Sequence, residues 1–244
     1  MIGGTACNLN LRDTDTEPRD TVDIDIILVS GNINAEFGRK FWKFIEDGRY
    51  QNRTRKRGEG KEPVPELFRF LRPQTPGYPQ QIEILSVQPD ILGEPSGFYL
   101  TPIPFDEDVP SLSAIIMDKE YYDFTLLHRI VKDGISVADL PSLICLKATA
   151  FVNLSHQRTE AKNSVQSHDI RKHRDDVFKL LSVIDAAHAV ELPKCIKQNV
   201  NTFVEMIESE INNREFLVSM KKVLGLNKES IEMYIDILKD LFQL

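Results

Sequence analysis

Two aspartates near the N-terminus have the type and spacing for metal chemistry. Residues 22–29 (VDIDIILV) alternate apolar residues with Asp23 and Asp25 and then become fully apolar. This pattern predicts a β-strand, and residues two apart in a strand face the same side, so the two carboxylates lie side by side. A divalent cation relieves their repulsion, and hard oxygen ligands suit Mg²⁺ or Mn²⁺. The alternative is a solvated face on an edge strand, but the apolar residues 26–29 favour a buried central strand.

A third acid, Glu83, interrupts the apolar run of residues 81–87 (QIEILSV), which predicts a second strand. If this strand lies beside the first, the Glu83 carboxylate completes a three-acid metal site with Asp23 and Asp25. The alternative is a lone glutamate that faces solvent from an amphipathic strand.

The chain opens with a pair of glycines, Gly3 and Gly4, followed by Thr5 and Ala6. Paired glycines before a helix start let the backbone approach a ligand closely, and free N–H groups there bind phosphate oxygens. An ordinary turn is the alternative interpretation.

Lys147 lies inside an apolar helical stripe rather than opposite it, and the stripe consists of Leu140, Ile144, Phe151 and Leu154. Its stem either snorkels to the surface or carries the ammonium group to a buried anion such as a triphosphate. Lys172 and Asp176 share a helical face with Asp169 and His173, where aspartate–lysine pairing at the surface is the alternative to a site. We do not expect His173 to be a metal ligand, because no second His or Cys lies at ligand spacing.

The remaining pattern predicts an α+β protein with a mixed-sheet domain over residues 1–125 and a helical bundle over residues 126–244. In the first part we expect a helix over 34–47, a third strand over 67–71, and loops over 53–61 and 73–79. In the second part, Thr202 and Glu205 predict a capping box, and Gly225 predicts a helix C-cap.

The amino-acid composition excludes some classes of function. The chain has 244 residues and a net charge of −7, which excludes a bulk DNA-coating protein because nonspecific nucleic-acid affinity needs surplus positive charge. Three widely spaced cysteines without metal or redox spacing indicate a reducing compartment. Without a secretory signal or a long apolar segment, we expect a cytoplasmic protein. The basic residues 53–61 are either a solvated loop or a contact for RNA phosphates.

The Gly-Gly-Thr-Ala opening, the Arg-x-Thr-x-Asp-Ile-Asp strand and the later acid resemble the nucleotidyltransferases of the DNA polymerase β-like superfamily, and more closely their AbiEii/AbiGii toxin type. The first two motifs stand here as Gly3 to Ala6 and Arg19 to Asp25. Residues 146–148 and 169–178 are similar to the C-terminal motifs of that family.

This resemblance implies a nucleotidyltransferase fold for the mixed-sheet domain and a role for each motif. Asp23 and Asp25 are expected to hold the metal of the nucleotide, with Asp25 bridging to a second metal that Glu83 binds. Glu83 is also expected to help deprotonate the acceptor hydroxyl. The nucleotide-binding set implied by the motifs is Gly3, Gly4, Thr5, Arg19, Thr21, Lys147, Lys172 and Asp176.

The implied activity is the Mg²⁺- or Mn²⁺-dependent transfer of a nucleoside monophosphate from a nucleoside triphosphate, such as ATP, to a hydroxyl on tRNA or protein. The implied context is a toxin–antitoxin or phage-defence pair with a cognate antitoxin protein. Two alternatives stay open. One is a nucleotidyltransferase for a small molecule, and the other is a catalytically inert nucleotide-binding or interaction module.

Overall fold

The computed structural model describes residues 1–29, 35–55, 64–86, 100–103, 112–160 and 165–244, and two compact units make up this part of the chain. The first unit contains residues 1–5 and 20–122, and the second contains residues 6–19 and 123–244. The units therefore separate between Tyr122 and Asp123, where we expected a division near residue 125. Residues 6–19 belong to the second unit although they precede the first strand.

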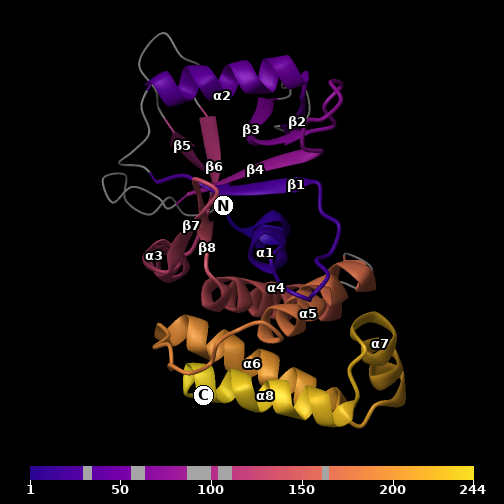
Figure 1. The fold of residues 1–244 in the computed structure, drawn as a ribbon. Helices are drawn as coiled ribbons and strands as arrows, with labels where there is room; N and C mark the ends of the chain where they lie inside the picture. The colour runs from indigo at the N-terminus through magenta and orange to yellow at the C-terminus, as the bar shows by residue number, and fades with distance from the viewer. Residues whose placement is uncertain (30–34, 56–63, 87–99, 104–111, 161–164) are drawn as a thin grey trace. The chain divides into compact units, whose positions relative to one another are not determined.

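A mixed sheet forms the centre of the first unit (Figure 1). Its described strands are β1 (Asp23–Ile27), β2 (Gln51–Arg55), β3 (Val64–Leu71), β4 (Gln81–Ser86), β5 (Leu100–Ile103) and β6 (Leu112–Ile116). The order is β2-β3-β4-β6-β5, and β1 pairs with β4 outside this path. Strand β4 runs parallel to β1 and β6 and antiparallel to β3. The predicted α+β class is confirmed, and strands occur at all three expected places.

Strand β1 is not the buried central strand that we expected. Among the described residues its ladder partner is β4, and an isolated antiparallel bridge joins its Asp25 to Ile2. All of its residues are half-buried. The alternation of Asp with Ile explains this difference, because one face of the strand carries carboxylates that are costly to remove from water.

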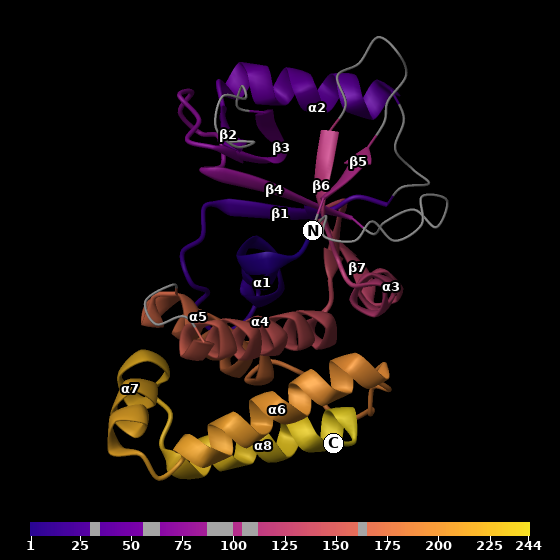
Figure 2. The same ribbon diagram turned by 180° about the vertical axis from the view of Figure 1, so that it is seen from behind.

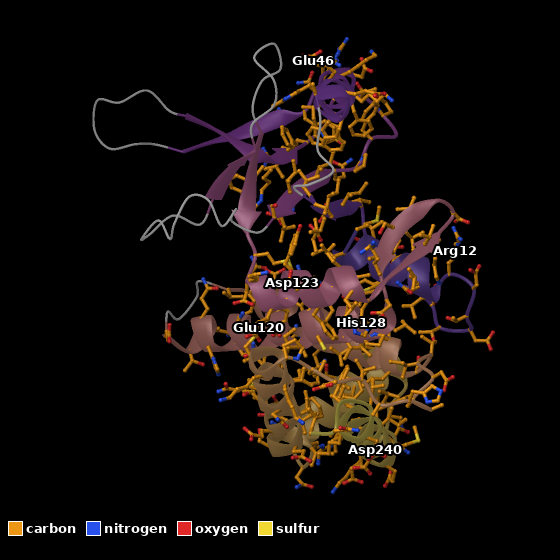
Figure 3. All side chains as sticks on the ribbon, turned by 90° about the vertical axis from the view of Figure 1, so that its left-hand side faces the viewer. Arg12, Glu46, Glu120, Asp123, His128 and Asp240 are labelled. Atoms are coloured by element: carbon orange, nitrogen blue, oxygen red, sulfur yellow. The ribbon has the colours of Figure 1, made fainter. Side chains whose placement is uncertain are left out.

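Helix α2 (Ala35–Gly48) covers one face of this sheet (Figure 1). Its aromatic residues pack on Phe68, Phe70, Ile82 and Ile84, which alternate along β3 and β4. The ring centroids of Phe41 and Phe70 are 5.5 Å apart in an edge-to-face arrangement. On the opposite side of the helix, Glu46 points away from the sheet (Figure 3). Because successive side chains of a strand point to opposite faces of the sheet, Asp23, Asp25 and Glu83 lie on the face that α2 does not cover.

Helices dominate the second unit (Figure 2). They are most of α1 (Gly3–Leu11), the C-terminal part of α3 (Lys119–Leu127), and the whole of α4 (Leu140–Glu160), α5 (Ser167–Leu181), α6 (Lys194–Glu210), α7 (Arg214–Leu224) and α8 (Lys228–Phe242). Helix α4 packs against α5 and α6. In both views α6 and α8 lie side by side, and Lys239 on α8 donates to Glu208 on α6 at 2.6 Å (Figures 1 and 2).

Local predictions in the second unit have mixed outcomes. Gly225 ends α7 in the left-handed conformation, as expected. The predicted capping box is wrong, because α6 already begins at Lys194 and the Thr202 hydroxyl donates to the carbonyl of Gln198 inside the helix. A wholly helical second part is also wrong, because β7 (Arg129–Lys132) and β8 (Ile135–Ala138) form a hairpin around Gly134, whose φ is +77°. The β-branched residues of this segment fit strands better than helices.

Two further expectations concern exposed segments. The basic residues 53–61 are not wholly a loop, since strand β2 extends to Arg55, and residues 56–63 lie outside the described part. Among the described residues, no helix has the length and hydropathy needed to cross a membrane.

Candidate active site

The carboxylates of β1 and β4 lie in a row on one face of the sheet. Because the two strands run parallel with Asp25 opposite Glu83, these residues are cross-strand neighbours. Side chains of such neighbours share a face, and Asp23 follows the same alternation two residues earlier. The two predicted strands are therefore neighbours in the sheet, as the three-acid hypothesis needs. Their register places Asp23, Asp25 and Glu83 close together on one face.

Gly3, the first residue of helix α1, lies against the side chain of Asp25. A Cβ atom at Gly3 would be only 1.9 Å from Asp25 Oδ2, and the φ of Gly3 is +75°. The amide of Ile2 donates to the Asp25 carbonyl at 3.0 Å, which holds this segment on β1. Only glycine combines this backbone conformation with so close an approach. The first turn of a helix, whose N–H groups have no partner within the helix itself, is therefore next to a carboxylate.

Thr5 joins the same helix start to β1 in a second way, because its hydroxyl donates to the carbonyl of Asp23. The hydroxyl hydrogen is thus used within the protein, and only the oxygen lone pairs stay available to another group. The role of Thr5 in phosphate binding remains a prediction. Thr21, also in the first unit, is half-buried two residues before Asp23.

Glu83 has a partner that we did not predict. Arg69 on β3 stands opposite Glu83 in the antiparallel ladder, and its Nε donates to Glu83 Oε1 at 2.5 Å. A second hydrogen bond joins Arg69 Nη2 to the same oxygen. The side chains are 28% and 16% exposed, so this pair is partly shielded from solvent. The signal was present in the sequence, because Phe68-Arg69-Phe70 and Ile82-Glu83-Ile84 alternate in the same way.

These contacts test whether the residues suit a divalent metal. Asp23 and Asp25 supply the hard oxygen donors that Mg²⁺ and Mn²⁺ take, so the pair fits one such cation. The full three-acid arrangement does not fit, because Arg69 engages Glu83. In agreement, the described part of the chain contains no group of three or more His, Cys, Asp or Glu residues positioned to hold a metal.

A buried ionic cluster lies in the second unit, where Asp176 on α5 contacts two cations. Lys147 Nζ on α4 donates to Asp176 Oδ2 at 2.7 Å, and Arg19 Nε lies 3.4 Å from Asp176 Oδ1. Lys147 is 5% exposed, so its ammonium group does not snorkel to the surface. The buried anion that it reaches in this structure is the carboxylate of Asp176.

The charges of this cluster shift the pKa values of its members. Burial raises the pKa of Asp176, but the charges and hydrogen bonds of Lys147 and Arg19 outweigh this effect, and the net pKa is lowered. The neighbouring thiol of Cys7 has its pKa raised to about 11, chiefly by burial. Asp176 is therefore an anion and Cys7 a neutral thiol at physiological pH.

His173 is a member of this cluster that we had set aside. Burial, then the positive charges of Lys147 and Lys172, lower the pKa of His173 to about 4. Its Nδ1 atom is buried and has no hydrogen-bond partner among the described residues. Lys172 itself donates to Asp169 at 3.0 Å, one helical turn away, as in the surface-pair alternative.

The predicted site residues thus fall into two groups. Gly3, Gly4, Thr5, Thr21, Asp23, Asp25 and Glu83 belong to the first unit, and Arg19, Lys147, Lys172 and Asp176 belong to the second. Two cavities of about 390 and 360 Å³ in the second unit are lined by none of these residues.

Comparison of the chain with models of protein families, with curated proteins and with solved structures finds no match.

Proposed function

We propose that this protein is a metal-dependent nucleotidyltransferase, which moves a nucleoside monophosphate from a nucleoside triphosphate to an acceptor hydroxyl. The observation that carries the proposal is the close approach of Gly3, in the first turn of α1, to Asp25, which lies opposite Glu83. A glycine-bearing helix start beside a pair of strand carboxylates supports the expected family assignment. The reaction needs groups that bind phosphate and groups that bind a cation, and this arrangement supplies both kinds side by side.

In this proposal the N–H groups at the start of α1, including those of Gly3 and Gly4, bind phosphate oxygens. Thr5 keeps that helix start on β1 through its bond to the Asp23 carbonyl. Asp23 and Asp25 would hold Mg²⁺ or Mn²⁺, which, when bound, offsets negative charge on the phosphates. Because Gly3 has no side chain, the backbone at this helix start can lie close to both the cation and the phosphates.

The ionic cluster of the second unit supports the nucleotide-binding part of the proposal by its charge. Lys147 and Arg19 contribute two positive charges against the single negative charge of Asp176. His173 adds no charge at neutral pH because its pKa is about 4. The surplus positive charge suits a phosphate group. We therefore keep Arg19, Lys147, Lys172 and Asp176 in the nucleotide-binding set, together with Thr21.

We further propose a macromolecular acceptor, tRNA or protein, and a biological role as the toxin of a toxin–antitoxin or phage-defence pair. This part of the proposal depends on the resemblance of the motifs described above. Transfer to a small molecule is the related alternative.

The test is transfer of label from each α-³²P-labelled nucleoside triphosphate, with Mg²⁺ or Mn²⁺, to total tRNA or to cell lysate. We expect labelled acceptor with the wild-type chain. The Asp23→Asn/Asp25→Asn variant should lose transfer by about 100-fold or more, since it removes the proposed cation ligands. Asp47→Asn is the matched control, because Asp47 is an exposed carboxylate on α2 that pairs with Lys43. Transfer that persists in the double variant would refute the proposed site.

One observation favours a second candidate, the inert nucleotide-binding or interaction module. The Glu83–Arg69 pair already neutralises one of the three acids, so the carboxylate row persists without requiring a metal at Glu83. This candidate predicts nucleotide binding by the wild-type chain without label transfer to any acceptor. Equilibrium dialysis with the labelled nucleotides, run beside the transfer assay, separates the two candidates.

A further inference from the structure

Three strands of the first unit place charged residues in one line across the sheet. Asp25 on β1 is opposite Glu83 on β4, and Glu83 is opposite Arg69 on β3. Cross-strand neighbours share a face, so the sequence of charges along the line is negative, negative, positive. With Asp23 on the same face, three carboxylates and one guanidinium share this part of the sheet.

The backbone around Arg69 is irregular in a way that separates it from β2. Between Asn52 and Arg53 the β2–β3 ladder shifts register, so that Phe70 faces Asn52 whereas the next pair joins Arg53 to Glu66. Arg69 lies between these two pairs on β3, and it is paired with none of the described residues of β2. Irregularities of this kind redirect side chains next to functional sites. Here the guanidinium turns toward Glu83 on the opposite neighbour, β4.

We infer that Arg69 occupies the place of a second divalent cation, and that Glu83 is the residue that positions it. This inference rests on the proposed function and specifies its cation requirement as one metal, held by Asp23 and Asp25. Glu83 accepts both hydrogen bonds on a single oxygen, Oε1, so the guanidinium is tied to the carboxylate row from one side. The guanidinium group of Arg69 supplies a positive charge at this place.

An arginine suits this position for two physical reasons. Its planar group presents several N–H donors, so two donors bind Glu83 while others remain for phosphate oxygens. A guanidinium is also weakly hydrated and is therefore more easily held in a partly buried setting than an ammonium group. In phosphoryl transfer, arginines commonly stabilise the charge that metals otherwise offset. Arg69 would contribute that charge without a second metal.

The test counts bound Mn²⁺ on the full-length protein by the loss of the free-ion signal in electron paramagnetic resonance. We expect about one Mn²⁺ per chain for the wild type and about two for Arg69→Met, because Glu83 is then released to bind metal together with Asp25. The double variant Arg69→Met/Glu83→Gln should return to about one. Arg69→Lys, which keeps the positive charge, should also bind about one. Arg39→Met is the matched control, since Arg39 is exposed on α2, on the other side of the sheet.

The results separate this inference from the proposed function. About two Mn²⁺ on the wild type, or no second Mn²⁺ on a folded Arg69→Met variant, overturns the inference and leaves the transferase proposal standing. No Mn²⁺ on the wild type overturns the proposed function and this inference with it. If Arg69→Met fails to fold, as judged by circular dichroism, the counts for the wild type and Arg69→Lys decide the question.

Discussion

Lys147 and Asp176 form an ion pair with an Nζ–Oδ2 distance of 2.7 Å, although their side chains are only 6% and 5% exposed. Removing two charges from water this completely is costly, so each needs the other and further hydrogen bonds. Arg19 provides a second cation for Asp176 at 3.4 Å. The consequences for stability can be measured without any substrate.

Loss of the Lys147 ammonium group should destabilise the protein. Lys147→Met leaves Asp176 buried with only the longer contact to Arg19, and we expect a loss of about 3 kcal/mol in the free energy of unfolding. Lys172→Met is the control, because Lys172 forms a more exposed pair with Asp169, and its loss should cost about 1 kcal/mol or less. Urea denaturation followed by circular dichroism measures both. Equal losses in the two variants would contradict the buried-pair interpretation.

A methyl group at Gly3 should disturb the contact with Asp25. Gly3→Ala combines an unfavourable positive φ with a Cβ atom 1.9 Å from Asp25 Oδ2. Gly77→Ala is the matched control, since Gly77 has a φ of +86° but nothing within 4 Å of its Cβ position. We expect about 1 kcal/mol of destabilisation for Gly77→Ala and about 1–3 kcal/mol more for Gly3→Ala. A Gly3→Ala variant no less stable than Gly77→Ala would show that the close approach is absent.

The half-buried imidazole of His173 should make the protein less stable in mild acid. Its pKa is about 4 in the folded chain, against 6.5 for an ordinary histidine, so between these values the unfolded chain binds a proton that the folded chain does not. The contribution of His173 is therefore fully present above pH 6.5 and is lost as the pH falls toward 4, by up to about 3 kcal/mol.

Urea denaturation at pH 7, 6 and 5 tests this expectation. His173→Gln should flatten the decline, whereas His168→Gln should not, because the His168 side chain is 77% exposed on the same helix. An unchanged slope in His173→Gln would assign the acid sensitivity to other groups.

The three cysteines should differ in reactivity. Cys7 and Cys145 are buried and burial raises the pKa of each thiol, to about 11 for Cys7, so few thiolates form near neutrality. Cys195 is partly exposed. We expect iodoacetamide at pH 8 to modify Cys195 first in the native protein, and all three after denaturation. Peptide mass spectrometry identifies the modified residues, and early labelling of Cys7 would contradict its burial.

Much of the local structure follows from sequence patterns alone. Strict alternation around Asp23 and Asp25 and around Glu83 predicts strands that the structure contains, and spacing of the Phe residues of 34–47 predicts the amphipathic α2. Such patterns are readable because a half-buried element repeats its environment every two or every 3.6 residues. Sequence patterns do not predict the hairpin at residues 129–138, because its two short strands lie between longer segments with helical spacing.

Tertiary structure alone decided how the charged residues are matched. Residue types and spacing identified Asp25, Glu83, Lys147 and Asp176 as chemically significant, yet they did not assign Arg69 to Glu83 or Arg19 to Asp176. Those partnerships join residues 14 and 157 positions apart in the chain, and they depend on strand register and on the packing of separate elements. A charge is recognisable from its own residue, but its partner is selected by the whole fold, because electrostatic energy depends on distance and burial.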